Sequence, residues 1–170
     1  MTKQNLNITD VLTNAIKAEF EGHSFYLMAA QATDDSKGKE VFKRLAQDEI
    51  QHAEYLRKQY DSWTETGAFD DSLPMTWKDN GPSDSSIFSD SLKGRIQGAH
   101  FEMTALSVGA QLEESAMRFY RRNAEATDNP ALKRVLFELA DWELKHYELL
   151  VKEMELLKGD FWSANQFAPF

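Results

Sequence analysis

The sequence predicts an all-α protein, a four-helix bundle made of two antiparallel helical hairpins joined by a long crossover. Apolar residues recur at helical spacing in four segments, and the 170 residues include only 8 Gly and 4 Pro. The two halves of the chain also match each other in spacing. A hydrophobic fraction of 42% suits one packed core, and the length fits one domain better than two. We therefore expect a single domain over residues 1–170.

The first hairpin is predicted over residues 9–60. A Thr-Asp pair at 9–10 suits a helix start, and the apolar helical spacing then continues to about Thr33. An Asp-Asp-Ser sequence at 34–36 offers a turn and a second helix cap. The second helix is predicted to end near Tyr60.

The crossover is predicted over residues 61–103, where Gly, Pro, Ser and Asp are frequent and which is too long for a simple turn. We expect a short helix around residues 87–96. Apolar residues of the crossover are expected to pack on the bundle; they are Trp63, Phe69, Leu73, Trp77 and Phe88.

The second hairpin is predicted over residues 104–158. Thr104 is the expected cap of its first helix, and an Asp-Asn-Pro sequence at 128–130 separates it from the second, which is expected to end near Gly159. The remaining tail, 159–170, is rich in aromatic residues. We interpret the tail as packing or a dimer contact, with a partner-recognition peptide as the alternative.

An internal repeat relates the hairpins without a gap at an offset of 94 residues. The polar residues that it matches are Glu19 with Glu113, Tyr26 with Tyr120, Glu49 with Glu143, and His52 with His146. The midpoint of each glutamate pair falls in the turn of its hairpin. Both glutamates of a pair therefore lie at the same height, about 20 Å from the turn.

Each hairpin also carries a Glu-x-x-His sequence, which places both side chains on one helix face. Leucines flank both faces, so the pairs are expected to point inward; these are Leu45, Leu56, Leu139 and Leu150. Four carboxylates buried together are costly unless they are protonated or balanced by positive charge. Two divalent cations would balance them, and carboxylate with imidazole suits iron or manganese.

These motifs resemble the ferritin-like di-iron proteins, and the segment AIKAEFEGHSFYLMAA resembles the rubrerythrin family most. The resemblance implies six metal ligands: Glu19, Glu49, His52, Glu113, Glu143 and His146. It further implies that Glu49 and Glu143 bridge the two metals, that Glu19 and Glu113 are terminal ligands, and that each metal has one histidine.

Four other residues are candidates for supporting the site. Tyr26 and Tyr120 are expected to hydrogen-bond ligand carboxylates. Asp48 is expected to orient a histidine of the other hairpin, and since its repeat partner is Trp142 the two sides differ. His23 is a candidate extra ligand or proton shuttle, with a pocket-lining role as the alternative. No catalytic residue beyond the ligands and no organic cofactor is expected.

The resemblance implies an oxidoreductase that reduces hydrogen peroxide or oxygen at two iron ions, with manganese or a mixed pair as the alternative. The chain has no cysteine, so it cannot build the rubredoxin-like iron site of rubrerythrin itself. An external electron donor, such as a rubredoxin-like protein, is therefore expected.

The family often has a further glutamate where this chain has Ala116, and the repeat partner of Ala116 is Gly22. Both small residues leave space beside the metals.

Two other functions remain open from the sequence: a ferroxidase or iron-handling protein, and an interaction bundle stabilised by metal without turnover. The formal charge of −9 argues against nucleic acid and anionic membranes as partners. The polar N-terminus and the absence of a long apolar run favour a cytoplasmic location. We expect a homodimer.

Overall fold

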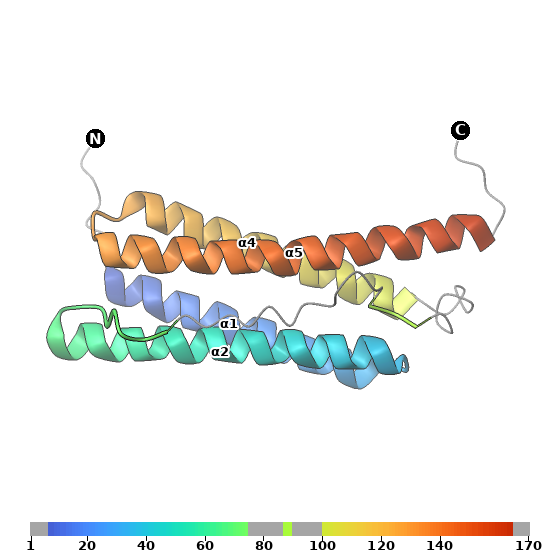
Figure 1. The fold of residues 1–170 in the computed structure, drawn as a ribbon, viewed down its shortest axis with the longest axis horizontal. Coiled ribbons are helices and arrows are strands. Elements are labelled where there is room, and N and C mark those ends of the chain that lie inside the picture. The colour runs from blue at the N-terminus through green and yellow to red at the C-terminus, as the bar shows by residue number, and fades with distance from the viewer. Residues whose placement is uncertain (1–6, 75–86, 90–99, 165–170) are drawn as a thin grey trace.

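The computed structural model describes residues 7–74, 87–89 and 100–164, with side chains up to Gly159. In order along the chain, the helices are α1 (Ile8–Ala32), α2 (Ser36–Thr66), α4 (His100–Ala126) and α5 (Pro130–Ala164). Figure 1 shows the four helices side by side, with the hairpin of α1 and α2 packed along the hairpin of α4 and α5. The predicted all-α bundle of two hairpins is confirmed.

Helix α1 begins at Ile8, one residue before the predicted start. Asn7 is its N-cap, and the Asn7 side chain accepts a hydrogen bond from the Thr9 backbone N–H. Helix α2 begins as predicted, with Asp35 as N-cap accepting from the Gly38 N–H at 2.7 Å. Both caps satisfy backbone donors that a helix start leaves unpaired.

The prediction that the second helix ends near Tyr60 is wrong. Helix α2 continues to Thr66 and stops at Gly67, whose φ of 72° is left-handed and therefore suits glycine. The last turn is polar, but it contains no residue that breaks a helix. The Thr66 hydroxyl donates to the Ser62 carbonyl at 2.8 Å, which keeps this polar side chain paired within the helix.

The second hairpin is also longer than predicted at both ends. Helix α4 starts at His100, and Thr104 is an interior residue whose hydroxyl donates to the His100 carbonyl at 2.8 Å. Helix α5 continues to Ala164, five residues beyond Gly159, so the start of the predicted tail is helical. At the turn, Asn129 accepts hydrogen bonds from the backbone N–H groups of Ala131 and Leu132.

Part of the crossover lies against the bundle. Ile87 and Phe88 are buried, and the Phe88 ring lies 6.3 Å from the Phe42 ring. Residues 87–89 are not helical, whereas the predicted helix began at 87; its remainder from 90 onwards lies outside the described residues, as does Trp77. Trp63 belongs to α2 and packs on Phe69.

The core consists of two apolar clusters, one toward each end of the bundle. One cluster contains Tyr26, Phe42 and Leu106, and the other contains Leu12, Tyr120 and Leu136. On every helix the site residues described below lie in sequence between members of the two clusters. The two apolar clusters therefore lie on either side of the site along the bundle axis, and they keep water from reaching the site from the ends of the bundle.

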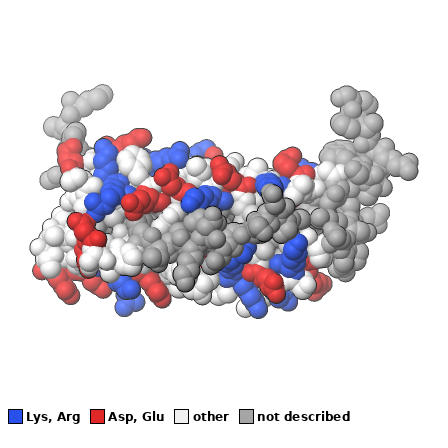
Figure 2. Space-filling view, in the orientation of Figure 1, with Lys and Arg blue, Asp and Glu red and all other residues white. Residues whose placement is uncertain are grey.

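The outer faces of the helices carry many charged residues, although some large apolar side chains, such as Phe20 and Met28, are also exposed. Lys, Arg, Asp and Glu are interspersed over the face seen in Figure 2, as expected for the solvent-facing sides of amphipathic helices. Within the described part of the chain, no helix combines the length and apolar character that crossing a membrane requires.

Candidate metal centre

Six acidic and imidazole side chains meet in the middle of the bundle. Every helix supplies at least one: α1 gives Glu19, α2 gives Glu49 and His52, α4 gives Glu113, and α5 gives Glu143 and His146. None of the six is more than 3% exposed. The repeat therefore brings together all six residues that the sequence singled out as ligands.

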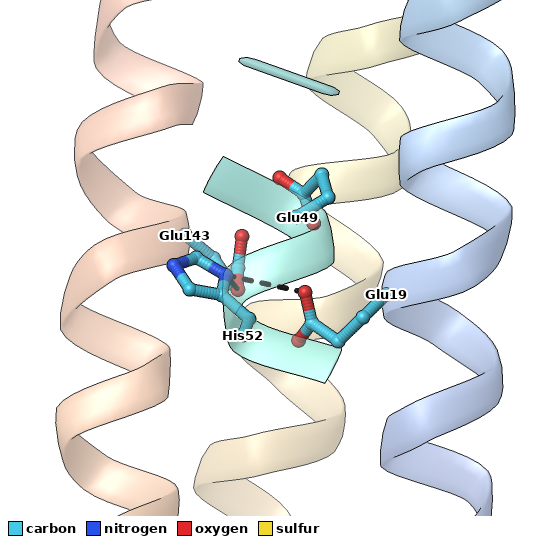
Figure 3. Close-up of side chains that lie close together, drawn as sticks. All are labelled: Glu19, Glu49, His52 and Glu143. Carbon is cyan, nitrogen blue, oxygen red and sulfur yellow. Dashed lines mark hydrogen bonds and ion pairs between the residues drawn. The ribbon is translucent and has the colours of Figure 1, made fainter. Parts of the chain in front are cut away.

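The six residues form two overlapping groups that could each hold an ion. One comprises Glu19, Glu49, His52 and Glu143, and the other comprises Glu49, Glu113, Glu143 and His146, with one ligand atom of each residue within 4.8 Å of the others. Figure 3 shows the first group, with side chains from three helices directed toward one point. Glu49 and Glu143 belong to both groups, which is the geometry that bridging carboxylates require.

Each histidine presents Nδ1 to the carboxylates. The Nδ1 atom of His52 lies 3.2 Å from Glu19 Oε2 and 3.3 Å from Glu143 Oε1. The Nδ1 atom of His146 lies 3.0 Å from Glu49 Oε1 and 3.5 Å from Glu143 Oε2. The two rings are nearly parallel, with centroids 5.8 Å apart. His52 is therefore the histidine of the first group, and His146 is the histidine of the second group.

Several of these buried atoms have no hydrogen-bond partner among the described residues. They are Glu49 Oε1, both carboxylate oxygens of Glu143, His52 Nε2 and both ring nitrogens of His146. The close His146–Glu49 contact does not have hydrogen-bond geometry. Buried polar atoms without partners are costly. Cations coordinated by the oxygens and the Nδ1 atoms would supply partners for most of them, so the residues fit a di-metal site.

Two buried tyrosines hold the outer carboxylates. The Tyr26 hydroxyl donates to Glu113, and the Tyr120 hydroxyl donates to Glu19, so each bond joins α1 to α4. Burial, together with nearby carboxylates, raises the pKa of both tyrosines well above the ordinary value. Both hydroxyls therefore keep their protons and remain donors.

The outer nitrogens of the two histidines have different neighbours. Asp48 Oδ2 lies 3.5 Å from His146 Nε2, whereas the Trp142 ring stacks on His52 at 4.8 Å. His23 belongs to neither group. Its Nδ1 atom lies 2.6 Å from the Ala46 carbonyl oxygen, which ties α1 to α2 beside the site.

A cavity of about 360 Å³ leads to the carboxylates between α1 and α4. Its inner wall includes Glu19, Glu49 and Glu113, and the exposed Glu21 and Ser115 show that it reaches the surface. The small residues Gly22 and Ala116 also line it; the complete lining adds Asn14, Ala18, Leu112 and Phe119. Sequence reasoning found neither these last four nor Glu21 and Ser115, because residues that line an opening carry no periodic signal.

The rubrerythrin family model matches residues 10–104, which is more than half of the chain. The chain belongs to the rubrerythrin family. Among solved structures, a hypothetical protein from Pyrococcus furiosus is similar, with a TM-score of 0.64 and 27% identity over 91% of this chain and 92% of that one. No curated protein matches the chain.

The charges in this rubrerythrin-family site are strongly coupled. Burial and the neighbouring Glu143 raise the pKa of Glu113 to about 8, and burial and the other carboxylates raise the pKa of Glu49. Burial opposes the charged form of His52, but contacts with Glu19 and Glu143 outweigh it and raise its pKa to about 9. The four carboxylates therefore need protons or cations to share the space.

Glu143 behaves in the opposite way. Burial alone would raise its pKa, but its contacts with His146 and His52 outweigh burial and lower it. Glu143 is thus the carboxylate that stays ionised most readily. Three other buried acids among the described residues, Asp35, Glu102 and Glu153, lie in neither group, and Glu102 accepts a hydrogen bond from the Thr33 hydroxyl at 2.8 Å.

Proposed function

We propose that the protein is a di-iron oxidoreductase of the rubrerythrin type, which reduces hydrogen peroxide or oxygen with electrons from an external donor. The observation that carries this proposal is the pair of overlapping buried groups at the inner end of a cavity that reaches the surface. An ion held only for stability would not need such an opening.

Each ion position would take one terminal glutamate, one histidine and the two shared glutamates. Glu19 and His52 would complete one position, and Glu113 and His146 would complete the other. Glu49 and Glu143 would serve both. Four carboxylates and two neutral histidines would balance two divalent ions, so the loaded site would carry no net charge.

Two bound ferrous ions would supply the two electrons that convert one peroxide and two protons into two waters. The chain's residues provide the surroundings. Tyr26 and Tyr120 fix the outer carboxylates, and the apolar clusters at both ends exclude bulk water. Gly22 and Ala116 keep the cavity open beside Glu49 and Glu113. The cavity volume of about 360 Å³ limits the substrate to a small molecule.

The electrons must come from another protein or cofactor. The chain contains no cysteine that could hold an iron–sulfur or rubredoxin-like centre. A separate donor of the rubredoxin type would therefore complete the cycle by reducing the oxidised site. Such a donor must approach within electron-transfer distance of the buried ligands.

Rapid mixing of the iron-loaded, reduced protein with one equivalent of hydrogen peroxide tests the proposal. We expect ferric absorption to develop faster than with free ferrous iron at the same pH, and the iron to stay bound afterwards. Oxidation no faster than that of free iron would contradict the proposal. Iron that leaves the site after oxidation would instead favour the iron-handling alternative.

The ligand assignment has its own test. Replacing both shared carboxylates, Glu49→Ala with Glu143→Ala, should abolish the binding of both ions while circular dichroism still reports a helical fold. The matched control is Glu148→Ala with Glu155→Ala, which removes two exposed acids from α5. Metal content that is unchanged in the first variant would refute the ligand assignment.

A further inference from the structure

The two ion positions are related by the repeat, and most of their surroundings are equivalent. Each has one terminal glutamate held by a tyrosine: Glu19 by Tyr120 and Glu113 by Tyr26. Each has one histidine with Nδ1 directed inward. Both share Glu49 and Glu143. Symmetry of this kind alone would make the two positions bind ions equally well.

The symmetry fails at the outer nitrogen of each histidine. His146 Nε2 has the Asp48 carboxylate 3.5 Å away. Neither Nε2 atom has a hydrogen bond. His52 Nε2 also has no ion pair among the described residues, and its ring is stacked on Trp142 at 4.8 Å with 22° between the planes. Asp48 and Trp142 occupy the same position in the repeat. One substitution within the repeat therefore separates the two sides.

A carboxylate behind a metal-binding imidazole strengthens it as a ligand. It attracts the outer N–H, fixes the ring with the other nitrogen toward the metal, and adds negative charge near the cation. An indole ring stacked on the imidazole supplies none of these effects. The His52 Nε2 atom is buried, and no described residue accepts a hydrogen bond from it.

We propose that the two ion positions are inequivalent, and that the His146 position, supported by Asp48, binds a divalent cation first and more tightly than the His52 position, which is covered by Trp142. This inference rests on the proposed di-metal function. Asp48 acts as a positioning residue, since it touches a ligand and does not touch the ion. Loss of such a partner typically weakens metal binding about 10- to 100-fold.

Titration of the chelator-treated full-length protein with Mn²⁺ tests the inference. Calorimetry gives the two affinities, and electron paramagnetic resonance distinguishes one bound ion from a coupled pair. We expect two steps separated by about 10-fold or more, with a single-ion signal dominant at one equivalent. Asp48→Asn should weaken the first step by about 10-fold or more and leave the helical circular dichroism unchanged.

Trp142→Phe is the matched control, because it keeps an aromatic ring on His52 and does not alter the His146 side. We expect its first step to match the wild type. If only repulsion between the ions separated the two steps, the two positions would bind the first ion equally well in the wild type. Asp48→Asn would then leave the first affinity almost unchanged, because the first ion could occupy the His52 position. That result, or equal affinities in the wild type, would overturn the inference. Failure of the wild type to bind two ions would overturn the proposed function as well.

Discussion

At the scale of single residues, two tyrosine hydroxyls hold the Oε1 atoms of Glu19 and Glu113. Tyr26 and Tyr120 bond to Glu113 and Glu19 across the α1–α4 interface. Their raised pKa keeps them as donors over the whole working pH range. They therefore restrict the terminal carboxylates to one orientation, which reduces the rearrangement needed when an ion binds.

Removing one tyrosine hydroxyl should weaken metal binding. Tyr26→Phe keeps the ring in the core but leaves the Glu113 oxygen without its donor, so we expect Mn²⁺ affinity to fall by about 10-fold in calorimetry. Tyr55→Phe is the matched control, since the Tyr55 hydroxyl contacts Gln59 and lies outside both groups. Equal affinity in the Tyr26 and Tyr55 variants would show that the hydroxyl has no positioning role.

A second prediction concerns the entrance to the site. Ala116→Leu adds bulk to the lining of the cavity and leaves all six candidate ligands unchanged. We expect two ions still to bind, while the oxidation of the ferrous protein by peroxide becomes several-fold slower. Ala126→Leu adds the same bulk at an exposed residue of the same helix, outside the cavity. Equal rates in the two variants would place the entry route elsewhere.

At the scale of elements, the start of α2 is joined to the crossover. Asp35 caps α2 and also accepts hydrogen bonds from the Ser89 hydroxyl and from the Ser89 N–H. Phe88 lies directly on Gly38, where a Cβ would be 2.6 Å from its ring. The absence of a side chain at residue 38 is what allows the crossover to pack there.

A methyl group at this point should therefore destabilise the protein. Gly38→Ala forces the buried Phe88 ring to move, and we expect the free energy of unfolding in urea to fall by about 1–3 kcal/mol. Gly159→Ala is the matched control, since a Cβ there meets nothing within 4 Å. Its better helix propensity should make it neutral or stabilising by up to about 1 kcal/mol. A stabilised Gly38→Ala variant would contradict the packing described here.

The elements differ in how well their sequence predicts them. The turns at 34–36 and 128–130 are encoded by local capping residues and were located correctly. The end of α2 was placed too early because polar residues in a last helical turn resemble those of a loop, and the end of α5 because a glycine such as Gly159 is a common helix stop. The contact of Phe88 with Gly38 has no signal in the sequence, since a non-helical crossover residue follows no period.

The ligand layer was predictable for a different reason. Helix geometry fixes the height of each residue in a hairpin, so equal distances from the two turns place Glu19 beside Glu49 and Glu113 beside Glu143. The cavity depends on how the hairpins are rotated against each other. Spacing along one chain does not determine that rotation.

At the scale of the whole molecule, the buried charges should link stability to pH. The pKa of Glu113 is raised to about 8 and that of His52 to about 9, so between pH 5 and 9 the folded chain holds protons that the unfolded chain releases. Stability of the chelator-treated protein should therefore fall as pH rises through this window. Bound ions replace those protons and should remove most of this dependence.

Thermal unfolding from pH 5 to 9, with excess chelator or with Mn²⁺, measures this effect. We expect the melting temperature with chelator to decline toward pH 9, and the gap between the two conditions to widen. Glu113→Gln should flatten the decline, because the glutamine cannot lose a proton. A chelator-treated protein that becomes more stable toward pH 9 would contradict the charge arrangement described for the site.

Each ion position takes ligands from both hairpins. One bound ion would therefore cross-link α1 and α2 to α5, and the other would cross-link α2 to α4 and α5, so both would join parts of the chain that lie far apart in sequence. In a protein without cysteine, such a link would be removable: binding of the ion to the folded site would add to the free energy of unfolding, and withdrawal of the metal would remove that contribution. The metal supply of the cell would then control how firmly the two halves of the molecule are held together, independently of any reaction at the site.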